Sequence, residues 1–318
     1  MSGTPPHATV IVAARNSAPT IAACLRSLQA QDFASAEIIL VDDGSDDDTA
    51  AIGRAAAVRV VRSPPVGASA ARNIGIELAR GDVIAFTDGD CIAAPGWLGA
   101  LVKGLRTTGA TGVGGRQVNV FPPAQQRLRA GFEAFFRVAS VLSDYTRGDD
   151  RPRRVAHNAS CCSAYRAEAL RAVGGFTAGL WPGEDVDLDL RLAATGAIFF
   201  YVPGAVVHHH RPGTFAWFRR MMRRYGEAER RLVRRHGRAR PVDHVPTVSA
   251  LFVGLHLLYA LPVCRPWLLG VDGMLLGAGV VGLALTTPLR LWPAVVAFGL
   301  AAVWEWHVGW WTSRAETA

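Results

Sequence analysis

Two aspartates, Asp88 and Asp90, stand one residue apart directly after an apolar run, in the stretch FTDGDC at 86–91. The run predicts a buried strand, and a tight turn after it can aim both carboxylates at one ion. Carboxylate oxygens are the ligands that Mg²⁺ prefers, and this cation commonly carries substrate phosphates as further ligands. A solvated turn is the alternative, because Asp and Gly are frequent in turns that bind no ion.

Polar residues take similar places elsewhere in the first 200 residues. The segments 8–14, 37–41 and 82–86 are predicted strands, and helical patterns such as 19–31 separate them. This alternation predicts a mostly parallel sheet, in which ligands bind at the carboxyl ends of the strands. The polar residues at or just after those ends are Asn16, Asp42, Asp43, Asp88 and Asp90. Together they predict a binding site at that edge.

The glycine-rich loops that most often bind phosphate are missing. Neither G-x-G-x-x-G after the first strand nor G-x-x-x-x-G-K-[ST] occurs, which argues against a Rossmann dehydrogenase or a P-loop enzyme. A phosphate bound here would need a metal and an arginine to neutralise it. Arg72 is the candidate, because it lies in the predicted helix that leads into the Asp88 strand; a surface arginine is the alternative.

A second group of candidates follows near residue 180. Glu184 and Asp185 come after a Gly/Pro turn and open an amphipathic helix. Acids at a helix N-terminus are explained by the helix dipole, at about 0.3–1 kcal/mol each, and this suffices for Glu184. Asp185 can in addition face a cleft and accept a proton from an attacking hydroxyl. The strand-like run at 205–210 ends in three histidines, one of which could complete the ligand set of an ion at Asp88 and Asp90, although most histidines at strand ends ligate nothing.

The last third of the chain is strongly apolar. The stretches 247–263, 267–285 and 291–311 are each near the length of about 20 residues that crosses a bilayer, and they predict two or three transmembrane helices. A buried helical hairpin is the alternative. Five cysteines without metal spacing, and a first segment without the features of a signal peptide, indicate that the N-terminal part lies in the cytosol.

An arginine-rich segment at 211–240 precedes these stretches and concentrates the net charge of +8. Apolar residues alternate with the arginines, which is typical of an amphipathic helix on an anionic membrane surface. Nucleic-acid binding is the other usual meaning of such a run, but the position beside the apolar stretches favours the membrane. We therefore predict a catalytic domain at 1–212, an interfacial helix at 213–243 and a transmembrane region at 244–318 in the cytoplasmic membrane.

Several motifs occur in the order and spacing of the family 2 glycosyltransferases, which the chain resembles over 8–225. They are VIVAARN, IILVDDGSDDDT, GASAARNIGIELARGDVIAFTDGDC, NASCCSAYRAEALRAVGGF and GEDVDLDLRLAATG. The resemblance implies a GT-A fold, an α/β fold with a mostly parallel central sheet, and a nucleotide-diphospho-sugar as donor. Two departures are the first-strand end, Ala-Ala-Arg-Asn in place of Pro-Ala-Tyr-Asn, and the absence of the polymer-synthase Q-x-x-R-W signature.

The resemblance also implies roles for single residues. Asp88-Gly89-Asp90 resembles the D-x-D motif that holds Mn²⁺ or Mg²⁺ against the donor diphosphate, and His208 aligns with a histidine that contacts the metal or diphosphate in some relatives. Asp185 matches the general base of inverting members. The residues that match donor contacts are Asn16, Asp42, Asp43, Arg72 and Asp88.

The implied activity is the transfer of a sugar, with inversion, to a hydroxyl of a lipid-linked saccharide or glycolipid at the cytoplasmic membrane face, with no nucleic acid as partner. One alternative is a polyprenyl-phosphate sugar synthase, whose acceptor is already an anion and needs little help from a base. Another is a membrane-anchored protein that binds nucleotide-sugars without catalysis. A membrane protein that binds DNA through the arginine-rich segment is the third.

Overall fold

The computed structural model describes residues 7–33, 35–123, 129, 132–133, 150–238, 241–244, 272 and 292–313. The chain forms two compact units, which we describe one at a time. The sheet unit comprises Met1–Phe121 and Ser143–Pro212, and the helical unit comprises Pro122–Leu142 and Gly213–Ala318.

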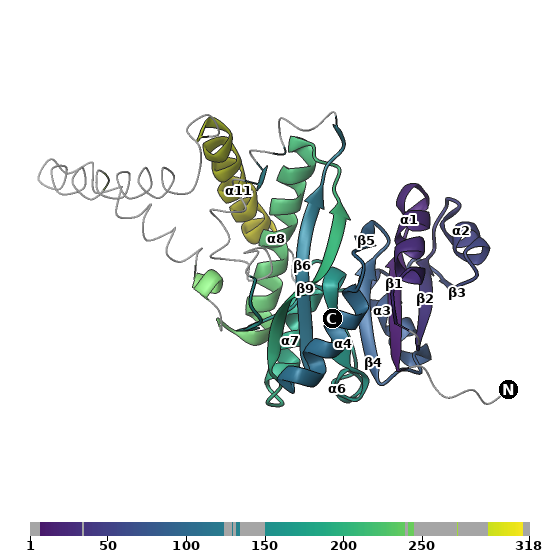
Figure 1. Cartoon of the computed structure of the whole chain (residues 1–318). Helices are drawn as coiled ribbons and strands as arrows, with labels where there is room; N and C mark the ends of the chain where they lie inside the picture. The colour runs from purple at the N-terminus through teal and green to yellow at the C-terminus, as the bar shows by residue number, and fades with distance from the viewer. Residues whose placement is uncertain are drawn as a thin grey trace, which may run out of the picture. The chain divides into compact units, whose positions relative to one another are not determined.

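A nine-stranded sheet forms the centre of the sheet unit (Figure 1). Its strands are β1 (Ala8–Ala14), β2 (Ala36–Asp43), β3 (Arg59–Ser63), β4 (Val83–Asp88), β5 (Cys91–Ala93), β6 (Gly112–Val120), β7 (Arg153–Val155), β8 (Ser163–Arg166) and β9 (Phe199–His210). They are ordered β3-β2-β1-β4-β8-β6-β9-β5, and β7 pairs with β9. The run β3-β2-β1-β4 is parallel throughout, as the alternation of strands and helices predicts, whereas β8 is antiparallel to both β4 and β6.

Helices cover both faces of this sheet. They are α1 (Ala18–Gln29), α2 (Thr49–Ala55), α3 (Ala68–Leu78), α4 (Trp97–Thr108), η4 (Ser160–Cys162), α6 (Ala167–Ala172) and α7 (Glu184–Ala193). Successive side chains of a strand point to opposite faces. In β1, Val10 and Val12 pack in one core cluster with α1 and α4, while Ile11 packs in the other with α3, α6 and α7. Burial on both faces explains why β1 is apolar without alternation.

The register of the parallel strands brings their carboxyl ends to one edge. Ala14 at the end of β1 pairs with Asp42 of β2, and Ala13 pairs with Asp88 of β4. Residues that follow β1, β2 and β4 are therefore neighbours in space, although about 70 positions separate the first from the last. At the other side of the sheet β5 pairs antiparallel with β9, which brings the end of β9 to the turn after β4.

The helical unit is built on α8 (Phe215–His236) and α11 (Trp292–Thr312), with η5 (Pro241–His244) between them in sequence. Phe298 of α11 stacks edge-on against Phe218 of α8, with ring centroids 4.7 Å apart. Glu305 of α11 is buried and accepts hydrogen bonds from the Nε atoms of Arg219 and Arg223, at 2.6 and 2.7 Å. These contacts hold the two helices together through both apolar and ionic groups.

Of the three predicted transmembrane stretches, the structure describes mainly the last. The stretches at 247–263 and 267–285 lie outside the described residues, apart from residue 272. The third stretch, 291–311, largely coincides with α11. Among the helices that the structure describes, none is both long and apolar enough to cross a bilayer, so the predicted span at 291–311 is not supported. Glu305 is a charged residue within this apolar stretch of the sequence, and it bonds to two arginines of α8.

Candidate active site

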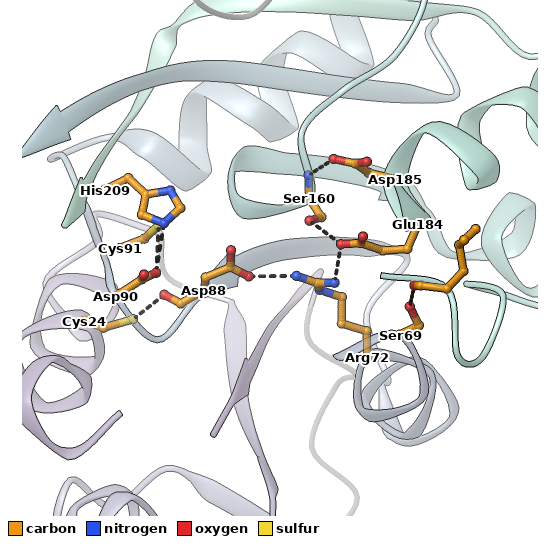
Figure 2. A network of polar contacts seen from close by, with 11 residues as sticks. Cys24, Ser69, Arg72, Asp88, Asp90, Cys91, Ser160, Glu184, Asp185 and His209 are labelled. Atoms are coloured by element: carbon orange, nitrogen blue, oxygen red, sulfur yellow. Dashed lines mark hydrogen bonds and ion pairs between the residues drawn. The ribbon is translucent and has the colours of Figure 1, made fainter. Parts of the chain in front are cut away.

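Four residues that could hold a metal ion meet at the carboxyl edge of the sheet (Figure 2). They are Asp88, Asp90, Cys91 and His209, and one ligand atom from each lies within 4.8 Å of the others. The turn after β4 aims Asp88 and Asp90 to this place, and β9 brings His209. The Nε2 atom of His209 lies 3.1 Å from Oδ1 of Asp90. Two carboxylates and an imidazole are a ligand set that suits divalent cations such as Mn²⁺ and Mg²⁺.

The histidine in this cluster is His209, whereas the sequence analysis named its neighbour, His208. In the β5–β9 pair, Cys91 stands opposite His209, while Ile92 stands opposite His208. Neighbouring side chains of a strand point to opposite faces, so only one of the two histidines can reach the aspartates. His208 is absent from the metal-binding groups found among the described residues. The sequence shows the alternation but not which face of β9 is turned to Asp90.

The environment of His209 favours its protonated form. Burial and the charge of Arg211 act to lower its pKa, but Cys91 and the hydrogen bond to Asp90 raise it, and the resulting pKa is about 9. For Asp90, burial acts to raise the pKa, and the hydrogen bond and charge of His209 together with Arg211 lower it below the ordinary value. Without a cation, Asp90 and His209 therefore form an ion pair.

Arg72 links this cluster to the start of α7. Arg72 is 3% exposed. Its guanidinium donates a hydrogen bond from one terminal nitrogen to Asp88 Oδ1 and from the other to Glu184 Oε1, both at 2.8 Å. The guanidinium also lies over the ring of Phe176, with 5.5 Å to the centroid. Burial acts to lower the pKa of Arg72, and the charges of Asp88 and Glu184 raise it above its ordinary value. Arg72 is therefore a buried, charged bridge and not a surface arginine.

Glu184 and Asp185 are neighbours with different surroundings. Gly183, at φ 95°, turns the chain into α7, and Glu184 is buried with only 3% exposed. Burial and the charge of Asp185 raise the pKa of Glu184 to about 7, against the opposing effect of Arg72. Asp185 is half-buried, and its carboxylate accepts hydrogen bonds from the backbone N–H groups of Ser160, at 3.3 Å, and Val186, at 2.8 Å. Asp185 is the more exposed residue of this pair.

Ser160 was not identified from the sequence. It belongs to η4 and bonds to both acids at the start of α7, since its hydroxyl donates to Glu184 Oε1 at 3.2 Å and its N–H to Asp185. A serine among small residues carries no sequence signal for such a role. Glu184 was explained from the sequence by the helix dipole alone, which omits its ion pair with Arg72, a residue 112 positions away.

The remaining predicted residues lie at the ends of β1 and β2. Asn16 is exposed, has a positive φ of 51° and accepts a hydrogen bond from the N–H of Asp46 at 2.9 Å. Asp42 is fully buried, and its Oδ2 atom has no hydrogen-bond partner, although Arg62 Nε lies 3.4 Å away. Asp43 uses its carboxylate to bind the N–H groups of Val66 and Gly67, which fixes the loop before α3. The structure thus places all three at the same edge as Asp88.

The family model for glycosyl transferase family 2 matches residues 9–174. The chain is 31% identical over 246 residues to the pre-mycofactocin glycosyltransferase of Mycobacterium tuberculosis, an alignment that covers 74% of this chain and 49% of that protein. It is 30% identical over 204 residues to glycosyltransferase AglE of Haloferax volcanii, which covers 62% of this chain and 64% of that protein. The chain therefore spans about half the length of the mycobacterial relative.

A solved structure resembles the chain over most of its length. The mannosyltransferase PcManGT from Pyrobaculum calidifontis, in complex with GDP-Man and Mn²⁺, superimposes with a TM-score of 0.59 at 24% sequence identity. The match covers 95% of this chain and 87% of that chain. Together with the family model, it confirms the predicted α/β fold of the GT-A type.

Proposed function

Because the chain belongs to glycosyl transferase family 2, we propose that it transfers a sugar from a nucleotide-diphospho-sugar to a hydroxyl group, with inversion at the anomeric carbon. One observation carries this proposal. Arg72 bonds to both Asp88 and Glu184, and so it joins a carboxylate–imidazole cluster suited to a cation with the start of α7, where Asp185 lies. A donor diphosphate and an acceptor hydroxyl would meet between these two groups.

The residues that would hold a divalent cation, Mn²⁺ or Mg²⁺, are Asp88, Asp90 and His209. Their donor atoms fit such an ion, and the PcManGT structure that resembles this chain contains Mn²⁺. When bound, the cation would neutralise the charge that develops on the leaving nucleoside diphosphate. Arg72 holds Asp88 in place for this role and keeps its own charge near the diphosphate.

Asp185 would act as the general base. A carboxylate in hydrogen-bond reach of the acceptor hydroxyl can take its proton as the oxygen attacks the anomeric carbon. Glu184 is not available for this, because Arg72 and Ser160 both bind it and it is buried. Ser160 orients the two acids through its N–H and hydroxyl. The accessible base favours a hydroxyl acceptor over a polyprenyl phosphate, which is already an anion.

The donor nucleotide would bind along the ends of β1 and β2. Asn16 is exposed there, and Asp42 has an oxygen that makes no hydrogen bond. Asp43 supports this part of the site indirectly, because its carboxylate holds the loop that begins α3.

The acceptor would be lipid-linked and the reaction would take place at the cytoplasmic membrane. Two features of the helical unit support this part of the proposal. The helix α8 carries many arginines, which attract anionic lipid headgroups. On α11, Leu300, Val303, Trp304 and Trp311 are each at least 60% exposed, and exposed apolar side chains of this size mark interaction surfaces.

Donor binding tests the central proposal. The full chain is titrated with UDP-, GDP- and dTDP-sugars, with and without Mn²⁺, while its thermal unfolding is followed. We expect one nucleotide class to raise the unfolding temperature only when Mn²⁺ is present, because the ligand binds the folded state alone. Asp90→Ala is expected to lose this shift. No shift with any donor in folded protein would overturn the proposal, and an unchanged shift in Asp90→Ala would overturn the cation site.

A further inference from the structure

A second set of metal-ligating side chains overlaps the proposed cation site at His209, and the proposed reaction does not use the two thiols of this set. One ligand atom from each of Cys91, Cys161 and His209 lies within 4.8 Å of the other two. All three residues are buried, and both cysteines are free thiols. They come from three separate elements, β5, η4 and β9, so that only the tertiary structure brings them together.

The chemistry of this set differs from that of the two aspartates. Two sulfur atoms and an imidazole form a soft ligand set, which selects Zn²⁺ over hard cations such as Mg²⁺. We propose that Cys91, Cys161 and His209 bind Zn²⁺, with solvent as the fourth ligand. Each thiol releases its proton to the solvent as its bond to the metal forms.

The distances allow this with small movements. In a tetrahedral site with metal–sulfur bonds of about 2.3 Å, the ligand atoms are about 3.3–3.8 Å apart. The ligand atoms of Cys91, Cys161 and His209 lie within 4.8 Å of one another, so they need to approach by at most about 1.5 Å.

The site also has a route for the ion and unused bonding capacity. The Asp90 side chain is 41% exposed, and it connects the buried cluster with solvent. The Nδ1 atom of His209 is buried and makes no hydrogen bond to any described residue. The imidazole therefore has a nitrogen available in addition to the one that contacts Asp90.

Zinc at this place would exclude the hard cation, because both sites require His209. Zinc would also displace η4, because Cys161 belongs to this helix. Ser160 directly precedes Cys161, and its N–H and hydroxyl donate hydrogen bonds to Asp185 and Glu184, so the displacement would disturb both acids. Zn²⁺ would therefore inhibit sugar transfer. This consequence rests on the proposed function, whereas the binding of zinc does not.

Cobalt provides the direct test, because Co²⁺ replaces Zn²⁺ and a cobalt–thiolate bond gives a near-ultraviolet charge-transfer band that carboxylate and imidazole ligands do not give. The full chain, purified under reducing conditions, is titrated with Co²⁺. We expect a charge-transfer band that saturates at one equivalent and disappears when Zn²⁺ is added. Absence of the band in folded protein would overturn the proposal.

Single substitutions assign the ligands. Cys91→Ser and Cys161→Ser are each expected to weaken Co²⁺ binding by at least about tenfold and to reduce the band. Cys162→Ser is the matched control, because Cys162 is an equally buried free thiol in the same short helix that lies outside the cluster. A band of undiminished intensity in Cys161→Ser, or one that is lost only in Cys162→Ser, would contradict the assignment.

Inhibition by zinc is the last experiment, and it distinguishes this proposal from the proposed function. If sugar transfer occurs with Mn²⁺, added Zn²⁺ is expected to inhibit the wild type and to inhibit Cys161→Ser much less. Equal inhibition of both would overturn the exclusion of one cation by the other. If no donor supports transfer, the proposed function fails, and the cobalt spectrum alone still decides whether the thiol site exists.

Discussion

Two adjacent acids, Glu184 and Asp185, show how their surroundings assign their roles. Glu184 is buried between Arg72 and Ser160, and burial raises its pKa to about 7. Asp185 is half-buried, and its carboxylate accepts hydrogen bonds from two backbone N–H groups. Paired acids whose environments differ in this way commonly divide structural and chemical work between them. Here Glu184 binds Arg72, and Asp185 is the acid that we propose as the base for the acceptor hydroxyl.

The role of Asp185 as general base gives the first residue-scale prediction. Asp185→Asn keeps the size of the side chain and one of its two acceptor oxygens but cannot accept the proton. We expect turnover to fall by about 10²–10⁴-fold, as for other general bases, while donor affinity with Mn²⁺ stays nearly unchanged. Turnover is measured by release of the nucleoside diphosphate, and donor affinity by calorimetry.

A matched control is Asp82→Asn. Asp82 is exposed and precedes β4, so it lies at the amino end of the strand that carries Asp88 at its carboxyl end. This variant is expected to behave as the wild type. Turnover of Asp185→Asn within about tenfold of the wild type would rule out the general-base assignment.

At the scale of elements, α8 and α11 make an unusually close approach. A Cβ atom on Gly226 of α8 would lie 1.9 Å from the carbonyl oxygen of Trp306, and a Cβ on Gly309 of α11 would lie 1.8 Å from that of Arg223. Each helix therefore presents a glycine to the backbone of the other. Only glycine fits at these two positions, because the neighbouring atoms are backbone and cannot rotate away.

This packing predicts the effect of one methyl group. Gly226→Ala must push the helices apart and is expected to destabilise the helical unit by about 1–3 kcal/mol. Gly299→Ala, on α11, is the control, because nothing lies within 4 Å of its Cβ position. There the better helix propensity of alanine should leave stability unchanged or raise it by up to about 1 kcal/mol.

The stability of both variants is measured by denaturant unfolding. Unfolding is followed by far-ultraviolet circular dichroism and by tryptophan fluorescence, to which the α11 tryptophans contribute. If Gly226→Ala and Gly299→Ala unfold at the same denaturant concentration, the close approach of α8 and α11 is not part of the folded state.

At the scale of the whole molecule, the charge distribution bears on where the protein works. The chain carries a net charge of +8, and α8 carries many of the arginines. Arg219 and Arg223 bind Glu305, although their side chains are 50% and 46% exposed, and Arg220 and Arg234 are exposed as well. The ion pairs with Glu305 stabilise the helix packing, and Arg220 and Arg234, which make no ion pair with Glu305, are expected to contact anionic lipid.

Vesicle binding tests this expectation. The full chain should sediment with vesicles of phosphatidylcholine and phosphatidylglycerol more than with phosphatidylcholine alone. Each arginine near an anionic surface contributes about 1 kcal/mol, so Arg220→Gln with Arg234→Gln should weaken binding by roughly 30-fold. The control Arg26→Gln with Arg54→Gln removes the same charge from exposed positions of the sheet unit and should have a smaller effect. Equal losses would mean that net charge, and not α8, attracts the protein to the membrane.

The sequence by itself determined the order of the elements and the edge where the site lies. Apolar runs of strand length, separated by helical patterns, suffice to predict parallel βαβ units, because side-chain periodicity is a local property. The position of Asp42, Asp43 and Asp88 at strand ends then follows, since parallel strands expose their carboxyl ends at one edge. The family 2 motifs added the expected role of each residue.

The tertiary structure alone decided which partners these residues meet. Strand alternation leaves two possible faces for the histidines of β9, and only the register against β5 selects His209 over His208. In the same way, Arg72 bonds to Glu184 across 112 positions, and Glu305 in an apolar run bonds to arginines more than 80 positions away. Local pattern gives the period of an element, whereas the pairing of side chains depends on contacts between segments that are distant in sequence.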